Sequence, residues 1–279
     1  MKFLYPLAKR FIAGHDFDSA KPKIKKLMDE GYEVSIDYLG ELSKTFDDCV
    51  RASEQYLEII NYYKDERIDL SIKPNQLGLS ISQSMAYNFV CDIAEEALKY
   101  KHTIRLDMEG SAVTQKTIKL CLKVKALFPN IGIAIQANLY STRQDIKLLV
   151  DSGISIRLVK GAYKEDSSIA LQKKDEIESA FFFYATDLNL EGAYKPAIAT
   201  HDERILKKIF KLRPKPKQFD YEFLYGVRRD LQKRLKNKKK CVRIYIPFGT
   251  DWLPYTLRRL KEWKNLMFII KNVLKEYFK

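Results

Sequence analysis

Residues 132–160 read GIAIQANLYSTRQDIKLLVDSGISIRLVK and contain one complete strand–helix–strand unit. The runs Gly132–Gln136 and Ile154–Lys160 are short, apolar and rich in isoleucine, which is typical of buried strands. Ser141–Val150, between them, has the apolar periodicity of a helix. A crossover through a helix joins parallel strands, so this stretch predicts a parallel sheet.

The ends of the predicted helices carry capping signals. Ser141 and Gln144 form a Ser-x-x-Gln capping box at the start of the helix just described. Gly153 follows its acidic end, and Gly31 follows an earlier one, as helix C-cap residues do. A further helix is predicted over Thr114–Phe128, where apolar residues recur along one side.

Apolar runs of this kind occur eight times along the 279 residues, with room for a helix between them. The other six are Val34–Asp37, Leu70–Lys73, Thr103–Asp107, Pro196–Thr200, Phe219–Leu224 and Val242–Ile246. Eight alternating units predict an α/β fold, a (β/α)8 or TIM barrel. An open doubly wound sheet also alternates, but no G-x-G-x-x-G follows the first strand and no P-loop occurs.

The barrel is predicted to be one domain over residues 1–279. Residues 1–33 precede the first strand and are interpreted as two helices, one ending near Gly14 and one near Gly31. The segment Trp252–Lys279 is interpreted as one helix or two, and an outer helix is expected after the eighth strand. No linker or internal repeat separates these parts.

Composition excludes some classes of protein. Apolar residues make up 46% and charged residues 31%, which excludes wholesale disorder, and the net charge of +14 favours anionic partners. The four cysteines form no C-x-x-C pair, so we expect reduced thiols and no metal site. No signal peptide is evident, and no run reaches the ~18–20 apolar residues of a spanning helix. We expect a cytoplasmic protein.

Polar residues cluster where the predicted strands end. In a TIM barrel the active site lies at the carboxyl ends of the strands. Charged groups inside apolar strands are costly to bury unless they are paired or bind a ligand. Either ion pairs in the barrel mouth or a binding site would explain them. The candidates are Lys73, Asp107, Gln136, Arg157, Lys160, Thr200, His201 and Tyr245.

Several motifs, in order along nearly the whole chain, resemble one enzyme family. They are Ser71-Ile-Lys-Pro-Asn-Gln-Leu-Gly78, Leu106-Asp-Met-Glu109, Arg157-Leu-Val-Lys-Gly-Ala-Tyr163, Ala199-Thr-His-Asp202, Tyr225-Gly-Val227, and Arg243-Ile-Tyr-Ile-Pro-Phe-Gly249 continuing through Trp252-Leu-Pro-Tyr255 to Arg258-Arg259. The chain resembles the proline dehydrogenase family in its short, single-activity bacterial form.

The resemblance implies a distorted (β/α)8 barrel and a reaction. The reaction is oxidation of L-proline to Δ1-pyrroline-5-carboxylate by hydride transfer to FAD, the first step of proline catabolism to glutamate. Electrons then pass to a membrane quinone. A separate pyrroline-5-carboxylate dehydrogenase would take the product, because the chain has no room for the second domain of the bifunctional form.

For the substrate, the resemblance implies that Lys73, Arg258 and Arg259 hold the proline carboxylate, which guanidinium forks suit. It implies that Tyr245 packs against the proline ring and that Tyr255 is a further active-site residue.

Two residues are candidates for the catalytic step. Asp107 matches an acidic residue beside the substrate that could orient Lys73 or Tyr245, or help remove the amine proton. We favour the orienting role, since neighbouring cations should lower the pKa of Asp107 and make it a weak base. Arg157 is expected near N5 of the flavin, where a cation stabilises the reduced ring.

The cofactor-binding residues follow from the same motifs: Met108, Gln136, Arg157, Lys160, Gly161, Ala162, Thr200 and His201. The chain departs from the family pattern at three positions near them. Gly110 and Lys164 replace residues that are commonly aspartate and tryptophan, and Asn138 stands where an aromatic residue is more usual.

Two other interpretations of the sequence remain open. A Schiff-base aldolase would use Lys73 or Lys160 as its nucleophile. A nucleic-acid-binding protein would use the basic run 228–240, although this run lacks interleaved aromatic residues, so no nucleic acid partner is expected. We expect the run instead to hold the protein electrostatically at the inner face of the membrane, in preference to insertion of the amphipathic tail 266–279.

Overall fold

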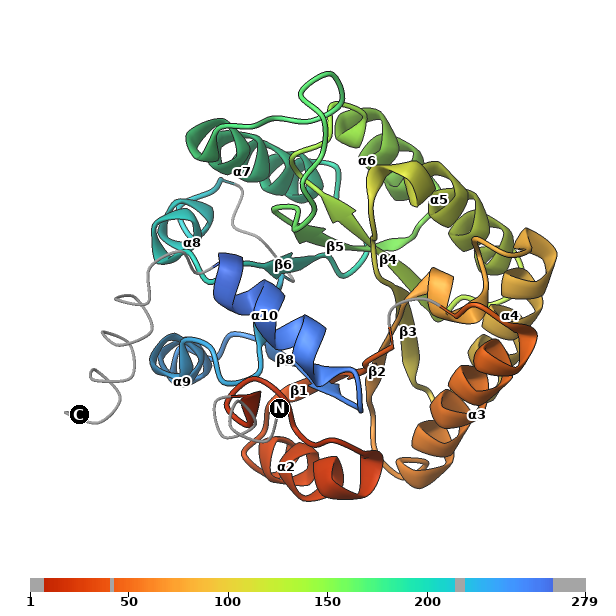
Figure 1. Ribbon diagram of the computed structural model, residues 1–279. Helices are drawn as coiled ribbons and strands as arrows, with labels where there is room; N and C mark the ends of the chain where they lie inside the picture. Colours follow the sequence, from red (N-terminus) through yellow and green to blue (C-terminus); the bar gives the residue numbers. More distant parts are fainter. Residues whose placement is uncertain (1–7, 41–42, 214–218, 263–279) are drawn as a thin grey trace.

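The computed structural model describes residues 8–40, 43–213 and 219–262, with the backbone alone for residues 258–262. Within this part, eight parallel strands form a closed barrel in which β1 also pairs with β8 (Figure 1). The (β/α)8 prediction and all eight predicted strands are confirmed. The strands are β1 (Glu33–Tyr38), β2 (Asp69–Ile72), β3 (Thr103–Leu106), β4 (Ile131–Gln136), β5 (Ser155–Val159), β6 (Ala197–Ala199), β7 (Asp220–Leu224) and β8 (Val242–Phe248).

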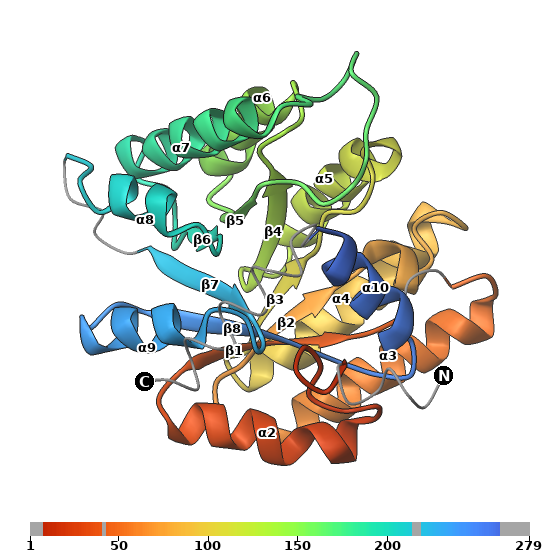
Figure 2. The same cartoon turned by 60° about the vertical axis from the view of Figure 1, so that its left-hand side comes forward.

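Helices alternate with the strands and surround the barrel (Figures 1 and 2). They are α2 (Phe17–Asp29), α3 (Phe46–Tyr62), the 3-10 helix η2 (Pro74–Leu77), α4 (Gln83–Lys99), α5 (Ser111–Lys125), α6 (Thr142–Asp151), α7 (Lys174–Leu190), α8 (Glu203–Ile209), α9 (Arg229–Asn237) and α10 (Trp252–Glu262). The helix predicted over Thr114–Phe128 is α5, which begins and ends earlier.

The two ends of the chain occupy unexpected places in the ring of helices. α2 contacts β1 and β8, and in Figure 1 it lies between α9 and α3. Because α2 covers this position, α10 is not an outer helix, and its Tyr255 lines the cavity at the carboxyl ends of the strands. The outer helix expected after the eighth strand stays a prediction for the tail 266–279, which lies outside the described residues. The predicted helix ending near Gly31 is α2. Most of the helix predicted to end near Gly14 lies outside the described residues. The tail 263–279 lies wholly outside them.

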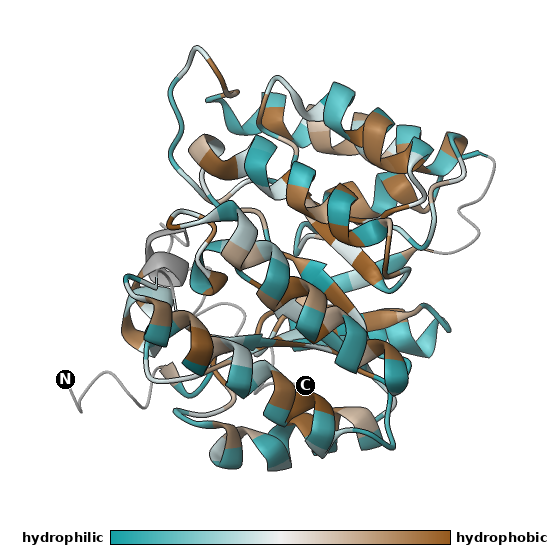
Figure 3. Cartoon of the chain, turned by 90° about the vertical axis from the view of Figure 1, so that its right-hand side faces the viewer, coloured by the Kyte–Doolittle hydropathy of each residue, from teal (hydrophilic) through white to brown (hydrophobic). Residues whose placement is uncertain are grey.

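The apolar core lies between the outer face of the barrel and the helices. Buried residues of α3, such as Ala52, Tyr56 and Ile59, recur at helical spacing and face the strands. Figure 3 shows the resulting hydrophobic and hydrophilic stripes along the helices. The barrel interior is polar instead: Ser35, for example, donates a 2.7 Å hydrogen bond to Asp69 on the next strand. TIM barrels more often fill this space with branched apolar side chains.

One of the predicted helix signals is wrong. Gly31 and Gly153 have positive φ angles of 74° and 63°, as predicted for C-cap residues. Ser141, however, already has helical backbone angles (φ −73°, ψ −17°) and makes no capping hydrogen bond. Its Oγ donates to Asp145 Oδ2 at 2.8 Å instead. The predicted capping box at Ser141 and Gln144 is therefore absent, since a box needs an extended N-cap residue.

Candidate active site

A cavity of about 490 Å³ lies at the carboxyl ends of the strands and collects the predicted site residues. Twelve of them line it: Lys73, Asp107, Met108, Gln136, Arg157, Lys160, Gly161, Ala162, Thr200, His201, Tyr245 and Tyr255. The remaining two, Arg258 and Arg259, belong to α10, and their side chains lie outside the described part of the chain. Asp37 of β1 and Glu222 of β7 also line the cavity, so residues in or directly after each of the eight strands meet in one place.

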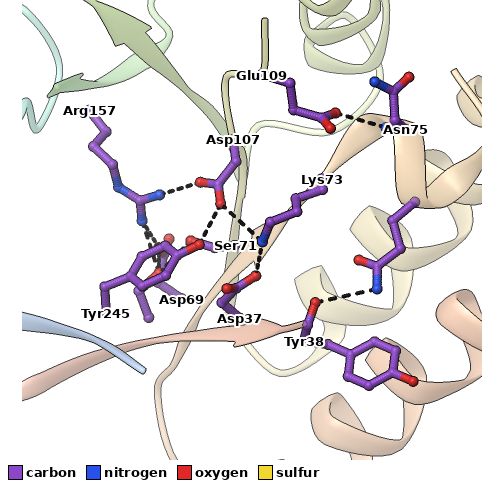
Figure 4. A network of polar contacts seen from close by, with 12 residues as sticks. Asp37, Tyr38, Asp69, Ser71, Lys73, Asn75, Asp107, Glu109, Arg157 and Tyr245 are labelled. Atoms are coloured by element: carbon purple, nitrogen blue, oxygen red, sulfur yellow. Dashed lines mark hydrogen bonds and ion pairs between the residues drawn. The ribbon is translucent and has the colours of Figure 1, made fainter. Parts of the chain in front are cut away.

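Arg157 is a fixed positive charge at the floor of the cavity. Its Nε and Nη2 each lie 2.7 Å from a carboxylate oxygen of Glu222, and its Nη1 donates to Asp107 Oδ1 at 2.7 Å (Figure 4). Nη2 also donates to Ser35 Oγ at 2.9 Å and lies 3.3 Å from Asp69. Burial alone would lower the pKa of Arg157, but the carboxylates of Glu222, Asp107 and Asp69 raise it overall. The guanidinium is therefore permanently charged and held from several directions.

Asp107 joins three other groups of the site. Its Oδ1 accepts from Arg157, while its Oδ2 accepts from the Tyr245 hydroxyl at 2.7 Å and lies 3.8 Å from Lys73 Nζ (Figure 4). The expectation that neighbouring cations leave the pKa of Asp107 below its ordinary value is wrong. Burial raises the pKa of Asp107, and Arg157 and Lys73 only partly offset this effect. The hydrogen bonds agree with an orienting role toward Tyr245 and Arg157.

Lys73 extends from the end of β2 and contacts Asp37 at the end of β1 (Figure 4). The Asp37 side chain is 0% exposed and that of Lys73 is 12% exposed. Burial would lower the pKa of Lys73, but Asp37 and Asp107 raise it overall. A Schiff-base nucleophile needs a lysine with a depressed pKa, so this environment argues against Lys73 as the nucleophile of an aldolase.

Two tyrosines line the predicted substrate side of the cavity. The Arg157 guanidinium carbon lies 5.3 Å from the centre of the Tyr245 ring, within the range of a cation–π contact. The hydroxyl bond to Asp107 fixes the orientation of this ring. Tyr255 of α10 is buried and packs with Phe11, Ile12 and other apolar residues near the N-terminus. This packing anchors α10 beside the cavity.

The predicted cofactor side of the cavity is built from the ends of β4, β5 and β6. Gly161 has φ +108°, and a Cβ placed there would lie 2.1 Å from Asn138 Oδ1. Only glycine fits this backbone position. The neighbouring Lys160 lies 3.3 Å from both Glu178 and Asp202. This pairing helps bring the pKa of Asp202 down to about 2, against the opposing effect of burial.

Three further predicted residues on this side have defined polar partners. Gln136 Nε2 donates to the Glu109 carbonyl at 3.0 Å, and Thr200 Oγ1 accepts from the Asp202 N–H at 3.2 Å. His201 Nε2 accepts from the Leu224 N–H at 3.0 Å, so this nitrogen carries no proton. Each side chain is thereby held in place at the cavity wall.

The carboxylates that hold the cations were not predicted from the sequence. Asp37 pairs with Lys73, and Glu222 and Asp69 pair with Arg157. A signal was present, because Asp37 ends the first predicted strand just as Lys73 ends the second. Glu222 likewise interrupts an apolar run. A buried cation requires a carboxylate partner, so each predicted cation implies a carboxylate nearby.

The fold and this cavity define a TIM-barrel protein whose site of cations, carboxylates and tyrosines lies at the carboxyl mouth, where enzymes of this fold bind substrates. Residues 20–268 match the family model described as proline dehydrogenase. The chain belongs to the proline dehydrogenase family. Among the described residues, no helix has the length and apolar character required to cross a membrane.

Two relatives agree with this assignment, and a solved structure shares the fold. "Proline dehydrogenase 1" of Bacillus subtilis subsp. natto is 34% identical over 276 residues, covering 96% of this chain and 91% of that protein. "Proline dehydrogenase" of Deinococcus radiodurans is 30% identical, covering 98% and 91%. The crystal structure of proline utilization A (PutA) from Bdellovibrio bacteriovorus inactivated by N-propargylglycine shares the fold, with a TM-score of 0.85 and 22% identity, over 95% of this chain and 33% of that one.

Proposed function

We propose that this protein oxidises L-proline to Δ1-pyrroline-5-carboxylate with FAD as the hydride acceptor, and that the electrons pass to a quinone. One domain over residues 1–279 would carry the activity, and another enzyme would take the product. The observation that supports this proposal best is the meeting of twelve family-motif residues in one cavity. Family membership supports oxidation of proline in particular.

The cavity has the features that a flavin ring requires. Its walls include small apolar residues, among them Ala134, Val159 and Ala199, which leave room for a flat ring. Gly161 allows the backbone to approach a ligand closely. FAD, when bound, supplies the acceptor for two electrons and a proton as hydride. Arg157 would hold a permanent positive charge beside N5, where it favours the reduced state.

On the substrate side, the protein's own residues would bind and orient proline. Lys73 keeps its proton because its pKa is raised, so it can attract a carboxylate. Arg258 and Arg259 follow Tyr255 by three and four residues along α10, and such positions share one face of a helix. We assign the carboxylate to Lys73 and these two arginines, and the proline ring to Tyr245. Asp107 would position Tyr245 through their 2.7 Å hydrogen bond.

Delivery of electrons to a quinone in the bilayer would need an encounter with the membrane. We assign this encounter to the basic run 228–240. The run is less charged than its sequence suggests, because Glu203 of α8 lies 3.0 Å from Arg228 and 2.8 Å from Arg234. Lys233 and the lysines at 238–240 remain exposed and can attract anionic lipid headgroups.

An absorption spectrum tests the cofactor and the substrate separately. Folded protein incubated with FAD and then separated from free FAD should show flavin absorption. Anaerobic L-proline should bleach this absorption, and D-proline serves as the control for stereochemistry. A folded sample that stays colourless would defeat the cofactor assignment. A coloured sample that L-proline does not bleach would defeat the substrate assignment.

A further inference from the structure

A second cavity, of about 720 Å³, lies at the opposite end of the barrel. Residues at or just before the start of every strand line it, from Glu33 of β1 to Arg243 of β8. The candidate active site lies at the carboxyl ends of the same strands. The residues assigned to binding proline and FAD do not include any residue of this amino-terminal cavity, although Lys239 and Lys240 also belong to the basic run 228–240. The buried charges of the cavity therefore require a separate explanation.

Arg105 of β3 is the deepest cation of the amino-terminal cavity and lacks acceptors. The residue is 4% exposed, yet its Nε and Nη1 have no hydrogen-bond partner among the described residues. Its nearest carboxylate oxygen, Asp69 Oδ2, lies 3.7 Å from Nε. Asp69 already accepts from Ser35 at 2.7 Å and Thr103 at 2.6 Å. A buried guanidinium with free donors is costly unless an anion accepts from it.

The neighbours of Arg105 on the adjacent strands are small residues. Across the sheet, Arg105 is in register with Ser71 on one side and Gly132 on the other, and Gly132 is followed by Ser155. A Cβ added at Gly132 would lie 2.7 Å from the Ser155 carbonyl oxygen. Branched side chains usually fill this layer of a TIM barrel. Here Arg105, Gly132 and Ser155 all line the cavity, so Arg105 forms part of its inner wall.

Three lysines surround the cavity in an unusual backbone conformation. Lys101, Lys195 and Lys239 have φ angles of 61°, 41° and 55° in the turns that lead into β3, β6 and β8. They are three of the four non-glycine residues with positive φ in the described chain, and all three are exposed. Glycine and asparagine adopt this conformation readily, whereas other residues lose about 1–2 kcal/mol. Lysine at all three turns therefore suggests a use for the charge.

The charge around the cavity has one dominant sign. Seven basic side chains line it against three acidic ones. Asp220 is engaged with Arg243 at 3.0 Å, and Asp69 is shared between Arg105 and Arg157. Among the described residues, Lys101 and Lys239 have no ion-pair partner. An anion entering the cavity would therefore meet free ammonium groups first and the guanidinium of Arg105 last.

We propose that the amino-terminal cavity binds a small multivalent phosphate anion, such as pyrophosphate or a phosphate ester. The guanidinium of Arg105, whose Nε–H and Nη1–H lack acceptors among the described residues, would supply the innermost positive charge for one phosphate. Lys101, Lys195 and Lys239 would hold the outer charge as mobile point charges. The site is separate from the flavin cavity, so both ligands could bind together.

Titration calorimetry of the FAD-loaded protein with inorganic pyrophosphate, at constant ionic strength, tests the proposal. Saturable binding is expected. The variant Lys101→Asn/Lys239→Asn should weaken it at least about tenfold, because two charge-assisted contacts are lost. Asparagine tolerates the left-handed conformation, so the fold is retained. The control Lys116→Gln/Lys119→Gln removes the same charge from the exposed face of α5 and should leave the affinity unchanged.

Arg105→Met should abolish pyrophosphate binding, and the asparagine pair keeps the test valid if this variant does not fold. Absence of saturable binding would overturn the proposal. So would equal weakening by the α5 control, which would show attraction to net charge alone. A parallel assay uses anionic phospholipid vesicles. If the asparagine pair loses vesicle binding while pyrophosphate binding is unchanged, the ligand is a lipid headgroup and the soluble anion is refuted.

Discussion

Replacing Lys73 with methionine should destabilise the protein strongly, because the lysine is the ion-pair partner of a fully buried carboxylate. Asp37 is 0% exposed, its Oδ2 has no hydrogen-bond partner, and its Oδ1 contacts Lys73. Among the described residues, Asp37 has no other ion pair. Breaking a buried pair by removing one partner costs about 3–5 kcal/mol. Since typical domains are stable by about 5–15 kcal/mol, Lys73→Met should lose a large part of the folding free energy.

Urea unfolding followed by circular dichroism measures this loss at pH 7, where Lys73 is charged. Lys99→Met is the matched control, because Lys99 forms an exposed pair with Glu96 at 2.7 Å and should contribute about 0–1 kcal/mol. The double variant Lys73→Met/Asp37→Asn should recover about 1–3 kcal/mol relative to Lys73→Met, since no charge is left unpaired. A loss no larger than that of the control, or a double variant that recovers nothing, would refute the reasoning.

Other perturbations address the proposed cofactor, substrate and membrane contacts. Asp202→Asn should have a lower free energy of unfolding than the native protein above pH 3.8, as measured by urea unfolding. The difference should vanish as the pH falls toward about 2, because the Asp202 carboxylate then becomes protonated in the folded protein. Arg258→Met and Arg259→Met should each raise the KM for L-proline at least about tenfold while flavin absorption is retained, and unchanged kinetics in both would remove this role. The protein should cosediment with anionic vesicles at low salt and release as salt rises, through the run 228–240; binding that ignores salt would point to insertion of the tail instead.

The fold could be predicted from the sequence because each strand has its own local signal. Apolar runs such as Gly132–Gln136 are short and separated by helix-length segments, and eight of them suffice to close a barrel. The place of α10 could not be predicted this way. It depends on α2, which packs on β1 and β8 and occupies the outer position next to the last strand. Competition between two distant helices for one surface leaves no local signal.

The position of the candidate site could be predicted from the sequence better than the pKa shifts and ion pairs of its residues. Asp107 and Arg157 could be placed at one mouth because the carboxyl ends of parallel strands meet there. The direction of the pKa shift of Asp107 was predicted wrongly, because the sequence shows neighbouring cations but not the extent of burial. Asp37 and Glu222 were missed for a related reason. Their partners lie 36 and 65 residues away in the chain and come close only in the folded barrel.

The polar interior links the two ends of the barrel through shared carboxylates. Asp107 bonds to Arg157 at 2.7 Å, Arg157 lies 3.3 Å from Asp69, and Asp69 lies 3.7 Å from Arg105. Each carboxylate is shared by several groups, so a stronger hold on one weakens the hold on the others. Because Asp69 is engaged with Arg157, Ser35 and Thr103, it cannot fully satisfy Arg105. Asp69 helps to fix Arg157 beneath the proposed flavin site. For the same reason, Arg105 at the opposite mouth is short of hydrogen-bond acceptors among the described residues.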